Sequence, residues 1–400
     1  MKRFHEQRWL LDTVVETIGI EWDQNRIAYT SAAAGPEAIG DFMGVKARVR
    51  KFSDIPREFA RAAKRREAAA RSGESEGRTV SARDSYFAAS LLYGSAMWAI
   101  FANTPENIEY NDRKIECYKK FIQFAPRKIT RVEIPFAGKS LPGYLHIPPQ
   151  ASGRVPCVLA IDGMDGFKEM MVAEYGDKLL ERGVAVLAID GPGQGECCVR
   201  EIHCETANFI EAGRAALTWL REQPAIDSDR IAISAVSMGS FWSTQIASAD
   251  EHLRGCAVAY VCHEPGLYTL LNAASPTFKL RFMYMAGYDD EEKFDGFARS
   301  MDLGNFAANI KCPYMAIAGE DDELSPIENT YRLMEQMTCP KELIVYQGER
   351  HSLHSTTSTA LGPSPHTYIA DWLADRLAAK PMESRRMFVD LAGQVQVTPW

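Results

Sequence analysis

The sequence predicts an α/β protein, in which a mostly parallel β-sheet with helices on both faces follows an all-helical N-terminal segment. Three observations carry this prediction. Helical periodicity dominates as far as residue 125, short apolar runs alternate with helical stretches after residue 130, and a turn of small residues around Ser237 joins one such run to a helix. Alternating strands and helices favour a parallel sheet, because each connecting helix packs on one of its faces.

The N-terminal segment has apolar residues at three- and four-residue spacing, or many residues that favour helix. These patterns lie in residues 58–71, 83–100 and 110–124. We expect about five helices, and their apolar faces need a surface to cover. Residues 1–125 are therefore expected to form a helical cap, or lid, in which the aromatic residues pack and one or two line the site. These are Tyr86, Tyr93 and Trp98.

The catalytic core is expected to span residues 126–380, with a C-terminal arm or added strand in 381–400. Its strands are predicted at 131–136, 141–147, 155–161, 184–189, 230–235, 256–262, 314–318 and 342–346. The first two form an antiparallel pair around Gly138, and the fully apolar runs that follow are typical of buried parallel strands. Its helices are predicted at 171–181, 206–223, 241–249 and 365–377.

Composition and charge exclude several classes of function. The net charge of −8, from 45 basic and 53 acidic residues, argues against a nucleic-acid or anionic-membrane partner. No apolar run approaches the roughly 20 residues that span a bilayer. The nine cysteines form no disulfide framework, and the group at Cys197, Cys198 and Cys204 lacks the paired spacing of a zinc site. A cytoplasmic protein without metal is expected, and also without nucleotide cofactor, because Gly191–Gly195 has neither phosphate-binding glycine pattern.

The nucleophile is predicted at Ser237, in Ala235-Val-Ser-Met-Gly-Ser240 between a strand and a helix. This is a relaxed nucleophile elbow, with Ala235 at the first glycine position. Small residues flank the serine because its strained turn brings neighbouring backbone close. The following helix N-terminus places the Met238 N–H where it can bind an oxyanion.

The acid and the base follow in the order that the α/β-hydrolase fold requires. After a strand, Gly319–Pro326 contains four acids, and the G-x-x-D-x-x-x-P spacing selects Asp322, with Asp321 as the alternative. After the next strand comes His351, with His354 as the alternative one turn later. A serine needs such a base, and the base needs a carboxylate to orient it. Ser237, His351 and Asp322 therefore predict a catalytic triad in an α/β-hydrolase fold.

The second oxyanion donor is expected in the glycine-bearing loop after the strand at 155–161, which reads Asp162-Gly-Met-Asp-Gly-Phe-Lys-Glu169. We select the Met164 N–H, with Gly163 and Asp165 as alternatives. This loop, Arg182–Glu196 with its Asp190-Gly-Pro-Gly-Gln-Gly-Glu196 turn, and the Ser237 elbow resemble the FrsA-like α/β hydrolases. Within that family the likeness is greatest to carbon–carbon bond hydrolases of the 2,6-dihydroxypseudooxynicotine hydrolase type.

The resemblance covers about residues 80–377 and implies a helical cap over the serine site, often a homodimer, and hydrolysis of a ketonic carbon–carbon bond or an ester. The sequence departs from the family at Ala235 and at Asp162–Asp165, where relatives have a Gly-Gly-Leu-Glu-like pattern. These departures leave the substrate open.

A carbon leaving group benefits from an additional acid near the nucleophile. Glu264, in a loop after a strand, is the candidate, with His263 beside it. Together with this acid, the resemblance implies a small-molecule substrate that is a ketone or β-diketone-like compound. The alternatives are a carboxylesterase or lactonase, and, in another class, a non-catalytic binding protein of the same fold.

Overall fold

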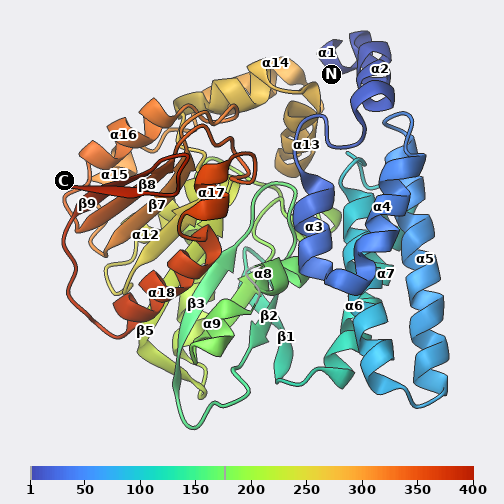
Figure 1. Ribbon diagram of the computed structural model, residues 1–400, viewed down its shortest axis with the longest axis horizontal. Helices are drawn as coiled ribbons and strands as arrows, with labels where there is room; N and C mark the ends of the chain where they lie inside the picture. The colour runs from blue at the N-terminus through green and yellow to red at the C-terminus, as the bar shows by residue number, and fades with distance from the viewer. Residues whose placement is uncertain (1, 175–176) are drawn as a thin grey trace.

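One ten-stranded sheet forms the centre of the protein in this computed structural model, which describes residues 2–174 and 177–400 (Figure 1). The strands lie in the order β1-β2-β4-β3-β5-β6-β7-β8-β9-β10. Their bounds are β1 Ile129–Phe136, β2 Lys139–His146, β3 Val155–Ile161, β4 Ala185–Ile189, β5 Ile226–Val236, β6 Cys256–Ala259, β7 Tyr314–Gly319, β8 Lys341–Tyr346, β9 Arg385–Val389 and β10 Val395–Pro399. Neighbouring strands from β4 to β9 run parallel, whereas β1, β2 and β10 pair antiparallel.

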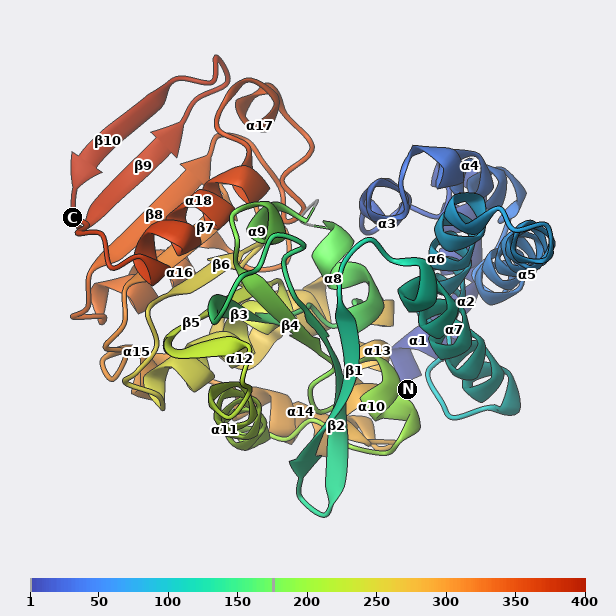
Figure 2. The same ribbon diagram turned by 90° about the horizontal axis from the view of Figure 1, so that it is seen from below.

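This topology confirms the predicted α/β-hydrolase fold. The strand order reverses at β3, so the loops after β3 and β5 lie side by side at the carboxyl edge of the sheet. The C-terminal stretch predicted as an arm or added strand contains two strands, β9 and β10, which extend the sheet at one edge (Figure 2).

Helices cover both faces of the sheet. On one face lie α10 Gly195–Val199, α11 Asn208–Arg221, α12 Met238–Ser248 and α16 Ile327–Glu335, and on the other lie α8 Lys168–Glu174, α9 Lys178–Glu181 and α18 Pro365–Leu377. The short α17 Thr357–Leu361 precedes α18. The helix predicted over 171–181 is divided into α8 and α9, with residues 175–176 outside the described part of the chain.

Seven α-helices precede the sheet in the described residues, where about five were expected. They are α1 Lys2–Glu6, α2 Arg8–Ile18, α3 Arg26–Ala34, α4 Ile39–Arg48, α5 Asp54–Ser75, α6 Thr79–Met97 and α7 Pro105–Phe124, and they share their own apolar core beside the sheet domain (Figures 1 and 2). The sequence prediction assigned no helix to the residues of α1–α4. The helices meet the core closely where Gly94 of α6 faces the Phe167 ring, since a Cβ there would lie 2.2 Å from the ring.

A helical insertion between β6 and β7 was missing from the sequence prediction. It contains α13 Pro276–Ala286, α14 Glu291–Arg299 and α15 Gly304–Ala307. Its apolar residues, such as Phe282 and Phe294, join the core cluster on one face of the sheet. In Figure 1, α13 and α14 lie toward the top of the molecule, between the sheet and α1–α2, and α15 lies beside α16. Among the described residues, no helix has the length and apolar character needed to cross a membrane.

Candidate active site

Ser237 occupies a sharp turn between β5 and α12. Its backbone has φ 53° and ψ −128°, a left-handed conformation that costs free energy for a residue with a side chain. The turn also requires small neighbours, because a Cβ at Gly239 would lie 2.5 Å from the Ile161 carbonyl oxygen. A Cβ at Gly163 would lie 2.8 Å from the Ser237 Cβ. The strained turn therefore holds the serine hydroxyl against the loop after β3.

His351 and Asp322 lie in line with Ser237. The Ser237 Oγ is 2.9 Å from His351 Nε2, and His351 Nδ1 is 2.9 Å from Asp322 Oδ2. Asp322 Oδ1 accepts hydrogen bonds from the Leu324 and Ser325 amides, both at 2.9 Å, which fix the carboxylate. The two partners come from the loops after β7 and β8, as the sequence predicts.

Neither alternative has this geometry. Asp321 is exposed, and its amide donates to the carbonyl oxygen of Glu349, which follows β8. His354 lies at the same cavity as Ser237, yet in the described part of the chain it makes no hydrogen bond to the serine or to an acid.

The electrostatics of His351 suit a general base. Burial alone lowers the pKa of the imidazole, but the Asp322 carboxylate and its hydrogen bond, with Glu323 nearby, raise the pKa above its ordinary value. Glu323 Oε2 also accepts the His351 backbone N–H at 3.0 Å. The ring is thus fixed in orientation and exposes Nε2 to the serine.

Two backbone amides are the candidate oxyanion donors. Neither the Met238 N–H nor the Met164 N–H donates to a residue within the described ranges. The Gly163 N–H donates to Asp162 Oδ1 at 2.7 Å, which leaves Met164 as the better donor of the two. Arg281 of α13 donates to the Met164 carbonyl oxygen at 3.3 Å and so helps to orient the peptide group.

The Gln194 side chain is hydrogen-bonded to the loop after β3. Its side-chain amide donates to the carbonyl oxygens of Asp162 at 2.6 Å and Gly163 at 2.9 Å, while its own oxygen accepts the Gly191 N–H. In this turn Gly193 and Gly195 have positive φ, in agreement with the tight turn predicted after β4. The sequence indicated the glycines of this motif, but not the role of its glutamine.

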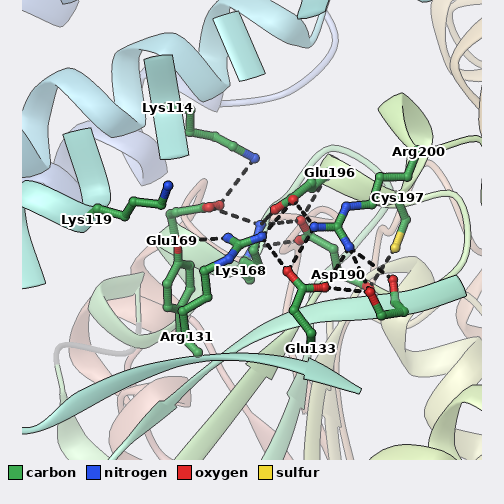
Figure 3. A network of polar contacts seen from close by, with 12 residues as sticks. Lys114, Lys119, Arg131, Glu133, Lys168, Glu169, Asp190, Glu196, Cys197 and Arg200 are labelled. Carbon is green, nitrogen blue, oxygen red and sulfur yellow. Dashed lines mark hydrogen bonds and ion pairs between the residues drawn. The ribbon is translucent and has the colours of Figure 1, made fainter. Parts of the chain in front are cut away.

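A buried network of charges supports the same turn (Figure 3). Lys168 Nζ lies 2.9 Å from Asp190 and 2.8 Å from Glu196, and their side chains are buried. Asp190 also accepts the Lys168 and Glu196 backbone amides, both at 2.8 Å. Burial alone would lower the pKa of Lys168, but the surrounding carboxylates raise it, so the lysine stays charged. On the cap side, Lys114 of α7 reaches Glu169 at 3.3 Å.

A cavity of about 280 Å³ opens beside Ser237 and His351. Its wall includes apolar side chains from three regions, namely Met170 of α8, Leu270 and Phe278 of the insertion, and Ala32 of α3. Its carboxyl groups are Asp162, Asp165 and Glu174, and no lysine or arginine is among its described lining residues. A small, largely apolar organic molecule fits such a cavity.

Two of these carboxyl groups have raised pKa values. Burial, above all, raises the pKa of Asp162 to about 7, with contributions from Asp190 and Asp165. Burial and the neighbouring Asp162 raise the pKa of Glu174 well above its ordinary value. Glu174 Oε2 is buried and has no hydrogen-bond partner among the residues that the structure describes. The sequence prediction missed both, because a carboxyl group in a strand–helix connection gives no signal of its own burial.

Glu264 has a different environment from the one expected. Its two carboxylate oxygens accept the backbone N–H of Thr269 at 2.7 Å and its hydroxyl at 2.9 Å, and Glu264 is absent from the cavity wall. The neighbouring His263 is buried against Thr330 and Tyr314, also away from the cavity. The carboxylate of Glu264 therefore holds the turn after β6, which is a correction to its candidacy as an acid facing Ser237.

The cap residues that line the cavity are not the aromatic residues considered from the sequence. Tyr86 and Tyr93 donate to Glu74 and Glu67 inside the cap, and Trp98 packs in the same core. The cavity is instead lined from the cap by Gln24, Tyr29 and Ala32. The weak pattern around α3 gave no signal for this.

No metal centre is apparent in the described part of the chain, where no three His, Cys, Asp or Glu side chains gather as ligands would. The nine cysteines are free and buried. Cys197 and Cys198 donate to the carbonyl oxygens of Asp190 and Gly193, so they pack in the turn after β4.

Comparison with known proteins identifies the family of this chain. The family described as Esterase FrsA-like matches residues 54–291, more than half of the chain. The chain belongs to the FrsA-like family. This confirms the resemblance seen in the sequence, and the FrsA-like chain is accordingly a hydrolase with an α/β-hydrolase fold.

Curated relatives of this FrsA-like protein are hydrolases. The alpha/beta hydrolase xenA of Xenoacremonium sinensis is 26% identical over 338 residues, covering 78% of this chain and 77% of the relative. The 2,6-dihydropseudooxynicotine hydrolase of Paenarthrobacter nicotinovorans is 26% identical over 269 residues, covering 67% and 70%. The crystal structure of the 2,6-dihydroxy-pseudo-oxynicotine hydrolase has a TM-score of 0.76 at 23% identity, covering 89% of this chain and 98% of that one, and shows the shared fold.

Proposed function

We propose that the protein is a serine hydrolase in which Ser237 is the nucleophile, His351 the general base and Asp322 the acid that orients it. The observation that carries the proposal is the continuous hydrogen-bonded line from Ser237 Oγ through His351 to Asp322 at the wall of the cavity. A non-catalytic binding protein would have no need for a serine in a strained turn with a base 2.9 Å away.

The reaction follows from this arrangement. Ser237 Oγ attacks a carbonyl carbon while its proton passes to His351 Nε2, and the oxyanion is bound by the Met238 and Met164 amides. Collapse breaks the bond to the leaving group, which takes a proton from His351 or from a neighbouring neutral acid; in the second case His351 returns its proton to that acid. Water, activated by His351, then hydrolyses the acyl-serine to release a carboxylic acid and regenerate Ser237.

For the bond that breaks, we propose a carbon–carbon bond in a ketone or β-diketone-like compound. The support is the relative that acts as 2,6-dihydropseudooxynicotine hydrolase, together with a cavity wall that carries carboxyl groups of raised pKa. A carbon leaving group gains from a neutral acid that gives it a proton, and Glu174 takes this part in place of Glu264. Ester hydrolysis is the second candidate, favoured by the name of the family and needing His351 alone as acid.

The test combines labelling with a substrate panel. A fluorophosphonate should label the wild-type protein at Ser237 and leave Ser237→Ala unlabelled. Aryl esters and β-diketones, with product mass spectrometry, then separate the two bond types. Labelling that persists in Ser237→Ala, or substrate turnover that does, contradicts the proposed nucleophile.

A further inference from the structure

The short segment before and at the start of α3 contacts the loops after β3, β7 and β8 and the insertion after β6. Residues 23–26 of this segment are called the clasp. Arg26 binds Asp165 in the loop after β3, Gln24 binds Glu323 beside Asp322, Asn25 binds Ser352 beside His351, and Asp23 binds Thr277 of the insertion. The clasp lies outside residues 54–291, which match the family.

Arg26 makes the strongest of these contacts. Its Nη2 and Nε lie 2.7 and 3.2 Å from Asp165 Oδ2, and its side chain is only 7% exposed. Its Nη1 is paired with Asp23, and the guanidinium stacks 3.9 Å from the centre of the Trp98 ring. A planar group held on so many sides fixes the carboxylate that it binds.

Asp165 follows Met164 directly, so the ion pair acts next to the amide proposed to bind the oxyanion. From the other sides, Arg281 holds the Met164 carbonyl and Gln194 holds the two preceding carbonyls. With Arg26 in place the loop is fixed from the core, the insertion and the cap together.

The remaining clasp contacts reach the histidine and acid loops. The Gln24 amide donates to Glu323 Oε1 at 3.2 Å, while the other oxygen of Glu323 accepts the His351 backbone N–H at 3.0 Å. Asn25 donates to the Ser352 hydroxyl at 3.3 Å. The histidine backbone is thus connected to the cap through one carboxylate and through its neighbour in sequence.

We propose that the clasp aligns the oxyanion loop with the nucleophile, and that Arg26 is its principal positioning residue. This rests on the proposed serine hydrolase function. Arg26 does not touch the reacting atoms; it acts through Asp165 on the direction of the Met164 N–H. Its loss should therefore weaken binding of the transition state more than binding of the ground state.

The test measures this difference with two ketones. An aryl trifluoromethyl ketone adds reversibly to the serine and forms an oxyanion, whereas the matching aryl methyl ketone binds without reaction. In Arg26→Met the affinity for the trifluoromethyl ketone should fall about 10- to 100-fold, less than the loss of an oxyanion donor itself, while the affinity for the methyl ketone changes less than about 3-fold. Arg26→Lys keeps the charge without the planar fork and should fall between the two.

Arg48→Met is the matched control. Arg48 pairs with the buried Glu58 at 3.0 Å within the cap, away from the clasp. Its removal should lower thermal stability and leave the ratio of the two ketone affinities unchanged. If Arg26→Met does not fold, Asp165→Asn removes the charge from the other side of the pair, and we expect the same change in the ratio.

Two outcomes overturn the proposal. An unchanged ratio in soluble Arg26→Met or Asp165→Asn removes the positioning role, and an equal loss for both ketones makes the ion pair a general support of the cavity. Fluorophosphonate labelling distinguishes a failure of the hydrolase function from a failure of the clasp proposal alone. If wild-type Ser237 is not labelled, the serine hydrolase function and the clasp both fail; if it is labelled and the ratio stays constant, the clasp alone fails.

Discussion

Two regions build the candidate site: the loops of the core, and the clasp, which contacts those loops from a distant part of the sequence. Ser237, Asp322 and His351 each follow a strand of one parallel sheet, so their meeting is a consequence of strand order. The clasp contacts instead join residues 139, 299 and 327 positions apart, across two apolar cores. The core therefore carries the candidate reacting groups, and the cap carries the contacts proposed to position them.

The largest expected effect tests the core side of this comparison. Ser237→Ala and His351→Ala should each lower kcat by about 10⁴- to 10⁶-fold, because either change leaves the attack on the carbonyl without its nucleophile or its base. Circular dichroism and thermal unfolding should show a folded protein in both variants. Near-normal turnover in either variant would show that the Ser237–His351 pair does not perform the reaction.

Asp322→Asn should lower kcat by about 10⁴-fold, because the neutral amide no longer holds the imidazole in the required tautomer. The pH profile of kcat/KM gives a second measurement. His351 must be neutral to act as base, so activity rises with pH through its pKa, which Asp322 raises above the ordinary value. With the carboxylate removed, burial dominates and the acidic limb should move to lower pH.

Asp321→Asn is the matched control for this prediction, since Asp321 is the exposed neighbour. It should change kcat less than about 3-fold and leave the limb in place. The reverse ranking of the two variants would assign the orienting role to Asp321.

The bond type is tested at the cavity wall. Glu174→Gln should lower carbon–carbon cleavage about 100-fold, the usual scale of general acid catalysis, and leave hydrolysis of an activated aryl ester nearly unchanged. The two rates are measured on the same preparation with a β-diketone and a nitrophenyl ester. Equal rates of carbon–carbon cleavage in variant and wild type would favour the esterase as the natural activity.

The fold and the three triad positions could be predicted from the sequence because their signals are local. Apolar strands, the small-residue turn at Ser237 and the acid and histidine just past strand ends each occupy a few consecutive residues. The fold class is confirmed, and the catalytic roles of Ser237, Asp322 and His351 stay predictions that the variants above test.

The features that sequence analysis missed depend on distant contacts. Arg26 and Gln24 look like ordinary surface residues until the cap is packed on the core, and Glu174 looks like a helix acid until its burial is known. The sequence prediction assigned no element to the insertion with α13–α15, although it supplies Phe278 and Arg281 to the site. Local patterns predict the elements, whereas burial and partners follow from packing.

The smallest effect is expected for substitution of Glu264, which tests whether this carboxylate only holds its loop or acts at the active site. Glu264→Gln should lower the free energy of unfolding by about 1–2 kcal/mol, because a charged acceptor of two Thr269 hydrogen bonds becomes a neutral one. Thermal or urea unfolding measures this loss. Activity on the β-diketone and on the ester should fall together and by less than about 3-fold, since the turn after β6 shifts without removing a proton donor. Thr269→Val, which removes one of the two donors, is the matched control and should behave alike. A selective loss of carbon–carbon cleavage in Glu264→Gln, with Thr269→Val unaffected, would instead bring Glu264 back as the acid that faces the leaving group.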